Sequence, residues 1–243
     1  MFFKRKEAVK TIEFNHAYEE FQNKEGNFTR FSAIPSVIMI NTNLIGNIKI
    51  EGYTDLLNPA LKGKIATTDP SASSSSFEHL VNMLYAMGNG DPEKGWDYVK
   101  KLCANLDGKL LSGSSAVYKG VADGEYAVGL TYEEGGINYV VSGSPVKVIY
   151  MKEGVISKPE GVYIIKGAKN LENAKKFIDY CVSLDAQNIL INKVNRRAIR
   201  KDASSSEVVI PMTEIYSIKD DPDFVESNRQ KWLDKFRDIY TGI

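Results

Sequence analysis

The residues that most often carry covalent or metal chemistry are scarce in this chain. Its 243 residues include two histidines and two cysteines. His16 and His79 stand alone, outside any metal-ligand spacing or recognisable order of nucleophile and base. Cys103 and Cys181 fall in separate predicted amphipathic helices, where a free thiol behaves as a small apolar residue. We therefore predict no disulfide, no cofactor and no enzymatic activity.

Long apolar runs are also missing. The longest aliphatic stretch, at 37–40, is far shorter than the roughly 20 residues that span a bilayer. No transmembrane helix is expected. A basic cluster follows Phe2 and Phe3 with no apolar segment behind it, so the first residues do not have the pattern of a secretory signal.

The chain has no excess of charge of either sign, because 31 Lys and Arg balance 31 Asp and Glu. No long-range field then draws it to nucleic acid or to an anionic membrane, and we predict no nucleic-acid partner. Any anion recognition must be local. The basic run at 193–201 is open to three interpretations: a solvated face, a docking patch or part of an anion site.

Strand and helix patterns alternate along the chain. Apolar residues recur at helical spacing from Phe77 to Met87, and Gly88 follows as a C-terminal cap. Other helices are predicted at 91–103, around 117–121, at 133–141, 170–181 and 225–239, and strands at 37–40, 64–67, 109–111, 126–131, 146–150 and 161–165. This alternation predicts an α/β fold with a mainly parallel sheet covered by helices.

A hydroxyl-rich turn at 69–76 lies between a predicted strand and a predicted helix. A helix start leaves backbone N–H groups unpaired and carries a positive partial charge, which suits an oxyanion. The alternative is N-capping, which needs one serine. The candidate ligand-binding residues of this turn are Ser71, Ser73, Ser74 and Ser75.

A second turn, with Ser112, Gly113, Ser114 and Ser115, repeats this arrangement. Ligands of open α/β folds lie beyond the carboxyl ends of strands, so we predict that both turns contact one ligand. A hydrolase that uses a serine of this second turn is the less favoured alternative.

A third predicted strand ends at Thr131, Tyr132 and Glu133. Phenolate and carboxylate oxygens suit a hard cation, and a carboxylate also suits sugar hydroxyls or an amine. An acidic first helical turn is the alternative. All three are candidate ligand-binding residues, and Tyr132 and Glu133 are candidate metal ligands.

Four segments, in order, resemble the ferric-type periplasmic solute-binding proteins of ABC importers. They are 53–70 (YTDLL, LKGKIA and DP), 114–134 (SSAVYKGVADGEYAVGLTYEE), 160–180 (EGVYIIKGAKNLENAKKFIDY) and 195–202 (NRRAIRKD). The resemblance runs from about residue 28 to the end. It implies a type II periplasmic-binding-protein fold, in which two lobes close on a solute and deliver it to permease subunits.

This resemblance also implies a domain plan and a location. Residues 43–150 would form the second lobe, and residues 1–42 and 151–243 the first. The protein would act in the periplasm, or outside the membrane in association with it.

Two departures from the family pattern bear on the solute. Iron-binding members carry adjacent tyrosines after the third strand, whereas Tyr132 is followed here by Glu133. Ile34 and Ser36 stand where some members place arginines for a companion anion. The pattern fits a small phosphate- or phosphonate-bearing anion, such as a sugar phosphate, at least as well as ferric iron.

A third departure concerns the first lobe. Family members begin with strands and helices that build half of it, so we expect a truncated chain with an incomplete first lobe. Uncovered sheet edges and apolar surface would then favour a homodimer or a domain swap. A truncated interaction protein that binds no solute is the alternative.

Overall fold

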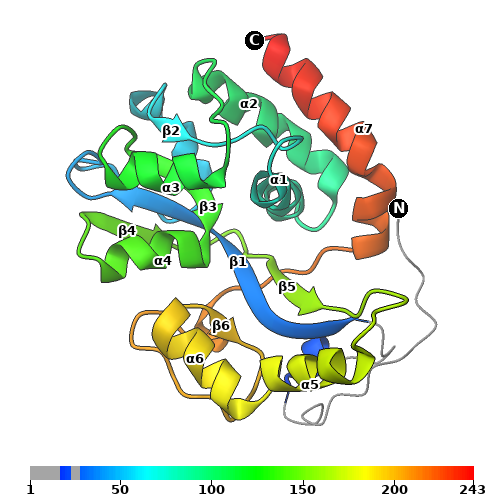
Figure 1. Cartoon of the computed structure of the whole chain (residues 1–243). Coiled ribbons are helices and arrows are strands. Elements are labelled where there is room, and N and C mark those ends of the chain that lie inside the picture. The colour runs from blue at the N-terminus through cyan, green and yellow to red at the C-terminus, as the bar shows by residue number, and fades with distance from the viewer. Residues whose placement is uncertain (1–16, 23–27) are drawn as a thin grey trace. The chain divides into compact units, whose positions relative to one another are not determined.

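The computed structural model describes residues 17–22 and 28–243, so His16 lies outside the described residues. Figure 1 labels the helices and strands. The strands are β1 (Thr29–Asn41), β2 (Ile65–Ala66), β3 (Val128–Tyr132), β4 (Val146–Ile149), β5 (Ser157–Val162) and β6 (Arg197–Ala198). The helices are α1 (Ser74–Met87), α2 (Trp96–Leu106), α3 (Ser114–Ala122), α4 (Glu133–Val141), α5 (Leu171–Cys181), α6 (Leu184–Val194) and α7 (Pro222–Thr241).

The chain forms two compact units and passes from one to the other three times. Unit 1 comprises the described residues up to Ile34 together with Lys158–Ile210. Unit 2 comprises Pro35–Ser157 and Pro211–Ile243. The long strand β1 belongs to unit 1 at its beginning and to unit 2 from Pro35 onward.

The sheet of unit 2 has the strand order β2-β3-β1-β4. β2 and β3 run parallel, with Ile65 opposite Val128. β1 runs antiparallel to both β3 and β4. The sheet is therefore mixed rather than mainly parallel as predicted, because β1 enters from unit 1 in the opposite direction to its neighbours.

Helices cover both faces of this sheet, and alternation along β1 decides which residue faces which layer. Ile38 and Ile40 lie in the main core with residues of α1, α2 and α7. Met39 points to the other side and packs with Val117 and Val121 of α3. Figure 1 shows α1, α2 and α7 on one side of β3 and α3 and α4 on the other.

Unit 1 is built around the first part of β1, which pairs with β5 and, antiparallel, with β6. Gln187 of α6 is fully buried; its amide donates to the carbonyls of Phe31 and Cys181 and accepts from the amide of Ile199. The apolar residues form two small separate clusters. Exposed apolar side chains remain in this unit: Tyr163, Ile165, Phe177 and Tyr180 are 55%, 73%, 62% and 51% exposed.

The division into units differs from the predicted lobes. Residues 35–42, 151–157 and 211–243, expected in the first lobe, belong to the unit that contains 43–150. The reason is packing: Trp232 and Phe236 of α7 are buried in the core that α1 and α2 also line.

Some of the local predictions are wrong and others are confirmed. The strand expected at 161–165 lies at Ser157–Val162 instead, and 109–111 contributes one bridge rather than a strand. The helix α6 was not predicted. Cys103 and Cys181 are both free, as expected. Among the residues that the structure describes, no helix combines the length and apolar character needed to cross a membrane.

Candidate functional site

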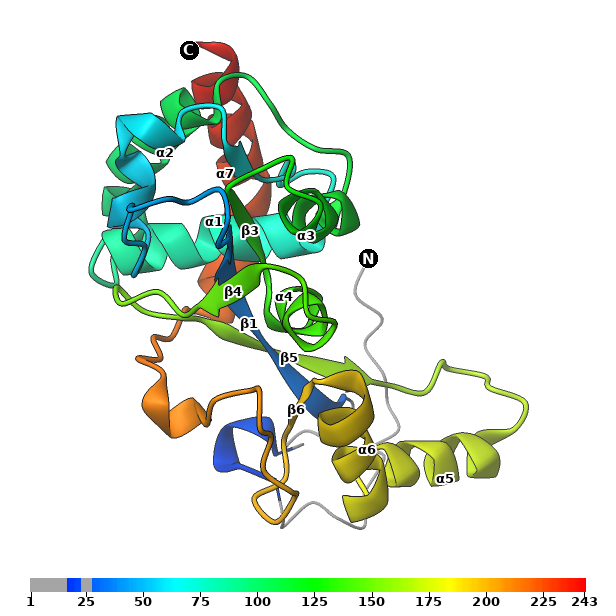
Figure 2. The same cartoon turned by 90° about the vertical axis from the view of Figure 1, so that its left-hand side faces the viewer.

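The three segments that the sequence singled out end at one edge of the unit 2 sheet. Thr68, just after β2, forms a parallel bridge with Leu111, whose amide donates to the carbonyl of Thr67 over 2.8 Å. β2 in turn runs parallel to β3. Parallel segments have their carboxyl ends at the same edge, so α1, α3 and α4 all begin there. Figure 2 shows these helices from a second side.

The start of α1 is organised by its serines. Ser73 is the N-cap, and its hydroxyl accepts from the amide of Ser76 at 3.4 Å. The same hydroxyl lies 3.0 Å from that of Ser75. The hydroxyl of Ser76 donates to the carbonyl of Thr68. The predicted alternative, capping, is thus present at Ser73.

Hydrogen-bond donors other than the amide that Ser73 caps remain at this helix start. Ser71 and Ser74 are exposed, and Ser75 is half-buried. The amides of Ser74 and Ser75 lie in the first turn, where no intrahelical carbonyl can pair with them. No acidic residue occupies that turn, so the helix dipole is not neutralised there.

The start of α3 lacks a side-chain cap altogether. Its N-cap is Gly113, which supplies no side-chain cap, and the first turn holds no acidic residue. Ser112 and Ser115 are exposed, and Ser114 is half-buried. α1 and α3 therefore both begin beside neighbouring strand ends, and the positive end of neither helix dipole has an acidic residue in its first turn.

The end of β3 places Thr131, Tyr132 and Glu133 at this edge. The ring of Tyr132 meets that of Tyr118 edge to face, with centroids 5.9 Å apart. Glu133 is 2% exposed, and its Oε1 accepts from the hydroxyl of Tyr150 at 2.5 Å. The buried hydroxyl of Thr131 has no hydrogen-bond partner among the described residues.

Sequence reasoning missed two residues at this edge. The hydroxyl of Thr68 is buried and, like that of Thr131, has no hydrogen-bond partner within the described part of the chain. Tyr150 was assigned only to a strand. Neither carries a sequence signal, because both depend on which strand ends become neighbours.

His79 is a buried, hydrogen-bonded histidine, which is one of the two interpretations, satisfied or exposed, that a lone histidine allows. Its Nε2 lies 2.6 Å from the carbonyl oxygen of Thr131 and 3.0 Å from that of Val37. Two carbonyl acceptors require the proton on Nε2, so Nδ1 accepts from the hydroxyl of Tyr53 at 3.1 Å. Burial lowers its pKa from 6.5 to about 4. It is therefore neutral and fully engaged, and it is not poised to activate a serine.

The basic run at 193–201 is not a simple solvated face. Arg197 and Arg200 are both buried. Arg200 forms a two-pronged ion pair with Asp202, at 2.9 and 2.7 Å, and donates to the carbonyl of Val182. Arg196 pairs with Glu160. The guanidinium groups of Arg196 and Arg200 therefore join separate segments within unit 1.

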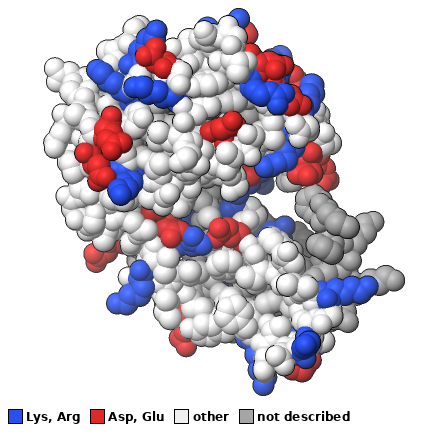
Figure 3. Space-filling view, turned by 45° about the horizontal axis from the view of Figure 1, so that its top comes forward, with Lys and Arg blue, Asp and Glu red and all other residues white. Residues whose placement is uncertain are grey.

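Surface charge shows the balance expected from the composition. Figure 3 shows basic and acidic side chains intermingled, with wide uncharged areas between them, on the face in view. A local anion site, rather than a broad field, is the arrangement that such a surface can support.

An α/β chain with helix starts at shared strand ends is the architecture of type II periplasmic binding proteins, and solved structures of that class match it. AfuA from Actinobacillus pleuropneumoniae, solved with fructose 6-phosphate, has a TM-score of 0.85 and 24% identity; the match covers 97% of this chain and 76% of AfuA. The ferric binding protein of Campylobacter jejuni has a TM-score of 0.71 and 21% identity, with coverage of 97% and 76%. The predicted type II fold is confirmed, and its sheet in unit 2 is mixed rather than mainly parallel.

The sequence comparison identifies the family. The pattern of the bacterial extracellular solute-binding proteins matches residues 2–234, so the chain belongs to that family. The spermidine/putrescine-binding periplasmic protein of Salmonella typhimurium is 25% identical over 185 residues, which are 72% of this chain and 52% of that protein. The chain spans about half the length of the curated relatives that it matches.

Proposed function

We propose that this chain captures a small solute outside the cytoplasmic membrane and delivers it to the permease subunits of an ABC importer. Membership of the extracellular solute-binding family and the type II fold support this role. Both are properties of binding proteins, so we also propose that the chain is not an enzyme. Its periplasmic location rests on the same likeness.

We further propose that the solute is a small anion bearing a phosphate or phosphonate group. The observation that carries this proposal is the pair of helix starts, α1 and α3, with serines in the first turn and no acidic residue. Their amides and hydroxyls are oriented donors for anionic oxygens. The neighbouring buried carboxylate of Glu133 suits a hydroxyl of the same solute.

Substitutions that add a negative charge to each helix start test this proposal. Ser74→Asp and Ser115→Asp each place a carboxylate in the first turn of a helix, which favours the helix by about 0.3–1 kcal/mol. The same carboxylate repels a bound anion. We expect the melting temperature to be kept or raised while the Kd for fructose 6-phosphate, measured by calorimetry, rises at least tenfold.

The matched control is Ser142→Asp, because Ser142 is exposed at the far end of α4. It adds the same charge to the same unit away from the candidate edge. Equal loss of affinity in all three variants, or no loss in any of them, would contradict the proposal.

Ferric iron stays a second candidate solute, with Tyr132 and Glu133 as proposed ligands. A likeness in fold to a ferric binding protein favours testing it. Tyr132→Phe and Glu133→Gln should each abolish the visible phenolate-to-iron absorption of a ferric citrate titration. Absence of that band in the unaltered protein would exclude this candidate.

We also propose that unit 1 associates with a second copy of the chain through exposed apolar side chains of α5. Phe177 and Tyr180 are three residues apart and share a helix face. Sedimentation should show a dimer that Phe177→Lys dissociates. A monomer at 100 μM would contradict the proposed homodimer or domain swap.

A further inference from the structure

Three stretches of unit 2 lie next to the points where the chain passes to unit 1. They are 35–37 of β1, 153–157, which ends on the first residue of β5, and 211–221 before α7; the crossings follow Ile34, Ser157 and Ile210. We call them the first, second and third connections. All contacts described below lie within unit 2.

Backbone hydrogen bonds join the connections to one another. The amide of Ser36 donates to the carbonyl of Ile156 over 3.3 Å. Val155 donates to the carbonyl of Tyr216 over 2.9 Å and accepts from the amide of Ile218 over 3.0 Å. The second connection thus lies between the other two.

One helix, α1, hydrogen-bonds to all three connections. His79 contacts the carbonyl of Val37 in the first. Asn82 donates to the carbonyl of Gly154 and accepts from the amide of Ile156, both at 2.9 Å, in the second. The hydroxyl of Tyr85 accepts from the amide of Asp221 in the third, over 3.3 Å.

These three side chains share a face of α1. His79, Asn82 and Tyr85 are spaced three residues apart and are 1%, 0% and 5% exposed. A buried polar side chain in such a place requires partners, and here the partners are the backbone of the connections. An apolar residue would otherwise suit these positions of a helix that is buried along most of its length.

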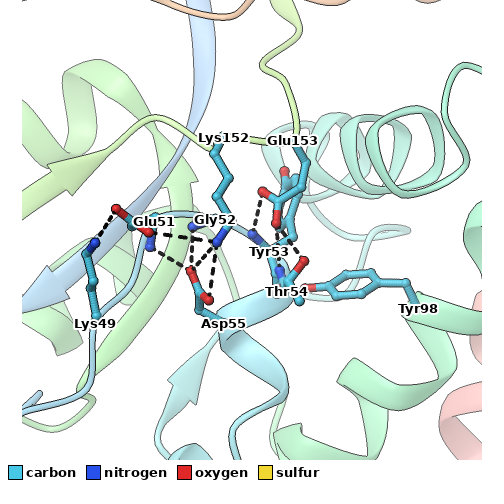
Figure 4. Close-up of polar contacts among 9 residues, drawn as sticks. All are labelled: Lys49, Glu51, Gly52, Tyr53, Thr54, Asp55, Tyr98, Lys152 and Glu153. Carbon is cyan, nitrogen blue, oxygen red and sulfur yellow. Dashed lines mark hydrogen bonds and ion pairs between the residues drawn. The ribbon is translucent and has the colours of Figure 1, made fainter.

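The second connection has another attachment, shown in Figure 4. Glu153 accepts from the amides of Tyr53 and Thr54, each at 3.0 Å, and from the hydroxyl of Thr54 at 2.7 Å. Tyr53 in turn contacts His79 through its hydroxyl. The network therefore runs from the second connection back to α1.

We propose that His79, Asn82 and Tyr85 are positioning residues through which α1 links its own N-terminus to the three connections. The helix is a rigid rod, and Ser76 and Tyr85 lie about 14 Å apart along its axis. A solute bound at Ser73–Ser76 would restrain the motion of α1. Through His79, Asn82 and Tyr85 it would also restrain the backbone of the connections that lead to unit 1. The part of this inference that involves a solute rests on the proposed function.

Two isosteric substitutions test the attachment without any ligand. Asn82→Leu and Tyr85→Phe remove the acceptors of the Ile156 and Asp221 amides, and hydrogen exchange reads those amides directly. We expect exchange at least tenfold faster at Ile156 in the first variant and at Asp221 in the second. Tyr85→Phe is the gentler change and keeps the test open if Asn82→Leu does not fold.

A matched control comes from α2. Asn105→Leu removes side-chain donors to the carbonyls of Leu56 and Asn58. It is the same substitution as Asn82→Leu, in the same unit, and it removes no contact to a connection or to Tyr53. If it speeds exchange at Ile156 and Asp221 as much as the α1 variants do, the positioning role is overturned.

A ligand arm then tests the link to the helix start, with fructose 6-phosphate as the probe. In the unaltered protein the probe should slow exchange at Ser74–Ser76 and also at Ile156 and Asp221. In Asn82→Leu the slowing at Ile156 should disappear while that at Ser74–Ser76 persists. Undiminished slowing at Ile156 would overturn the inference.

Failure of the proposed function gives a different result. A protein that does not bind the probe contradicts that solute for the candidate site, whereas the ligand-free exchange rates still decide whether α1 holds the connections.

Discussion

His79 donates from Nε2 to the backbone carbonyl of Thr131 over 2.6 Å, which fixes α1 to the carboxyl end of β3. Val37, the partner of Thr131 across the β1–β3 ladder, accepts from the same nitrogen. One neutral imidazole thus holds a helix against two paired strands. A second proton on the ring keeps the Nε2–H bonds to both carbonyls, but it removes Nδ1 as the acceptor for Tyr53 and places a charge in a fully buried site.

This arrangement predicts a pH-dependent stability. Burial lowers the pKa of His79 to about 4, whereas the unfolded chain protonates near 6.5. The unfolded state therefore binds the proton first, and the free energy of unfolding should fall as the pH drops from 6.5 to about 4, by roughly 3 kcal/mol. Urea unfolding at pH 7, 5.5 and 4 measures it. In His79→Gln this part of the slope should vanish.

A second prediction concerns Gly52 and Glu153. A Cβ at Gly52 would lie 1.8 Å from Oε2 of Glu153, so Gly52→Ala must displace that carboxylate from the amides of Tyr53 and Thr54. We expect a loss of roughly 1–3 kcal/mol in unfolding free energy. The loss should be much smaller when Glu153→Ala is already present. Additive effects of the two substitutions would contradict the contact.

The assignment of α7 to unit 2 predicts unequal effects of two aromatic truncations. Trp232 is fully buried, whereas Phe224 is 40% exposed on the same helix. Trp232→Ala should cost about 3–5 kcal/mol of stability, and Phe224→Ala clearly less. Chemical denaturation of both variants compares them, and equal costs would mean that α7 is not part of this core.

The cysteines should differ in reactivity. Burial raises the pKa of the Cys103 thiol to about 12, and the thiol of half-buried Cys181 has a raised pKa as well. Since the thiolate is the reactive form, a disulfide reagent at pH 8 should label Cys181 slowly and Cys103 only after unfolding. Cys181→Ser should then leave no thiol that reacts in the folded protein.

Periodic elements were predictable from the sequence because local pattern decides them. The recurrence from Phe77 to Met87 and the cap at Gly88 gave α1 within a few residues. The serine turns were placed correctly between strand-like and helical segments, and the structure brings them to one edge. Their part in binding stays a prediction.

Long-range pairing was not predictable in the same way. The direction of β1 relative to β3 depends on the crossing from unit 1, which no local pattern reveals. The same holds for α7, whose buried stripe indicates an apolar partner without saying which one. Asn82 carries no sequence signal of its role, because that role depends on the second connection lying against it.

The most direct test of the account is a map of backbone amides by NMR during titration with fructose 6-phosphate. The account predicts saturable shifts at Ser74, Ser75, Ser114 and Ser115, and weaker ones along α1 toward Asn82 and Tyr85. Saturable binding with shifts confined to other residues, leaving both helix starts unchanged, would contradict it.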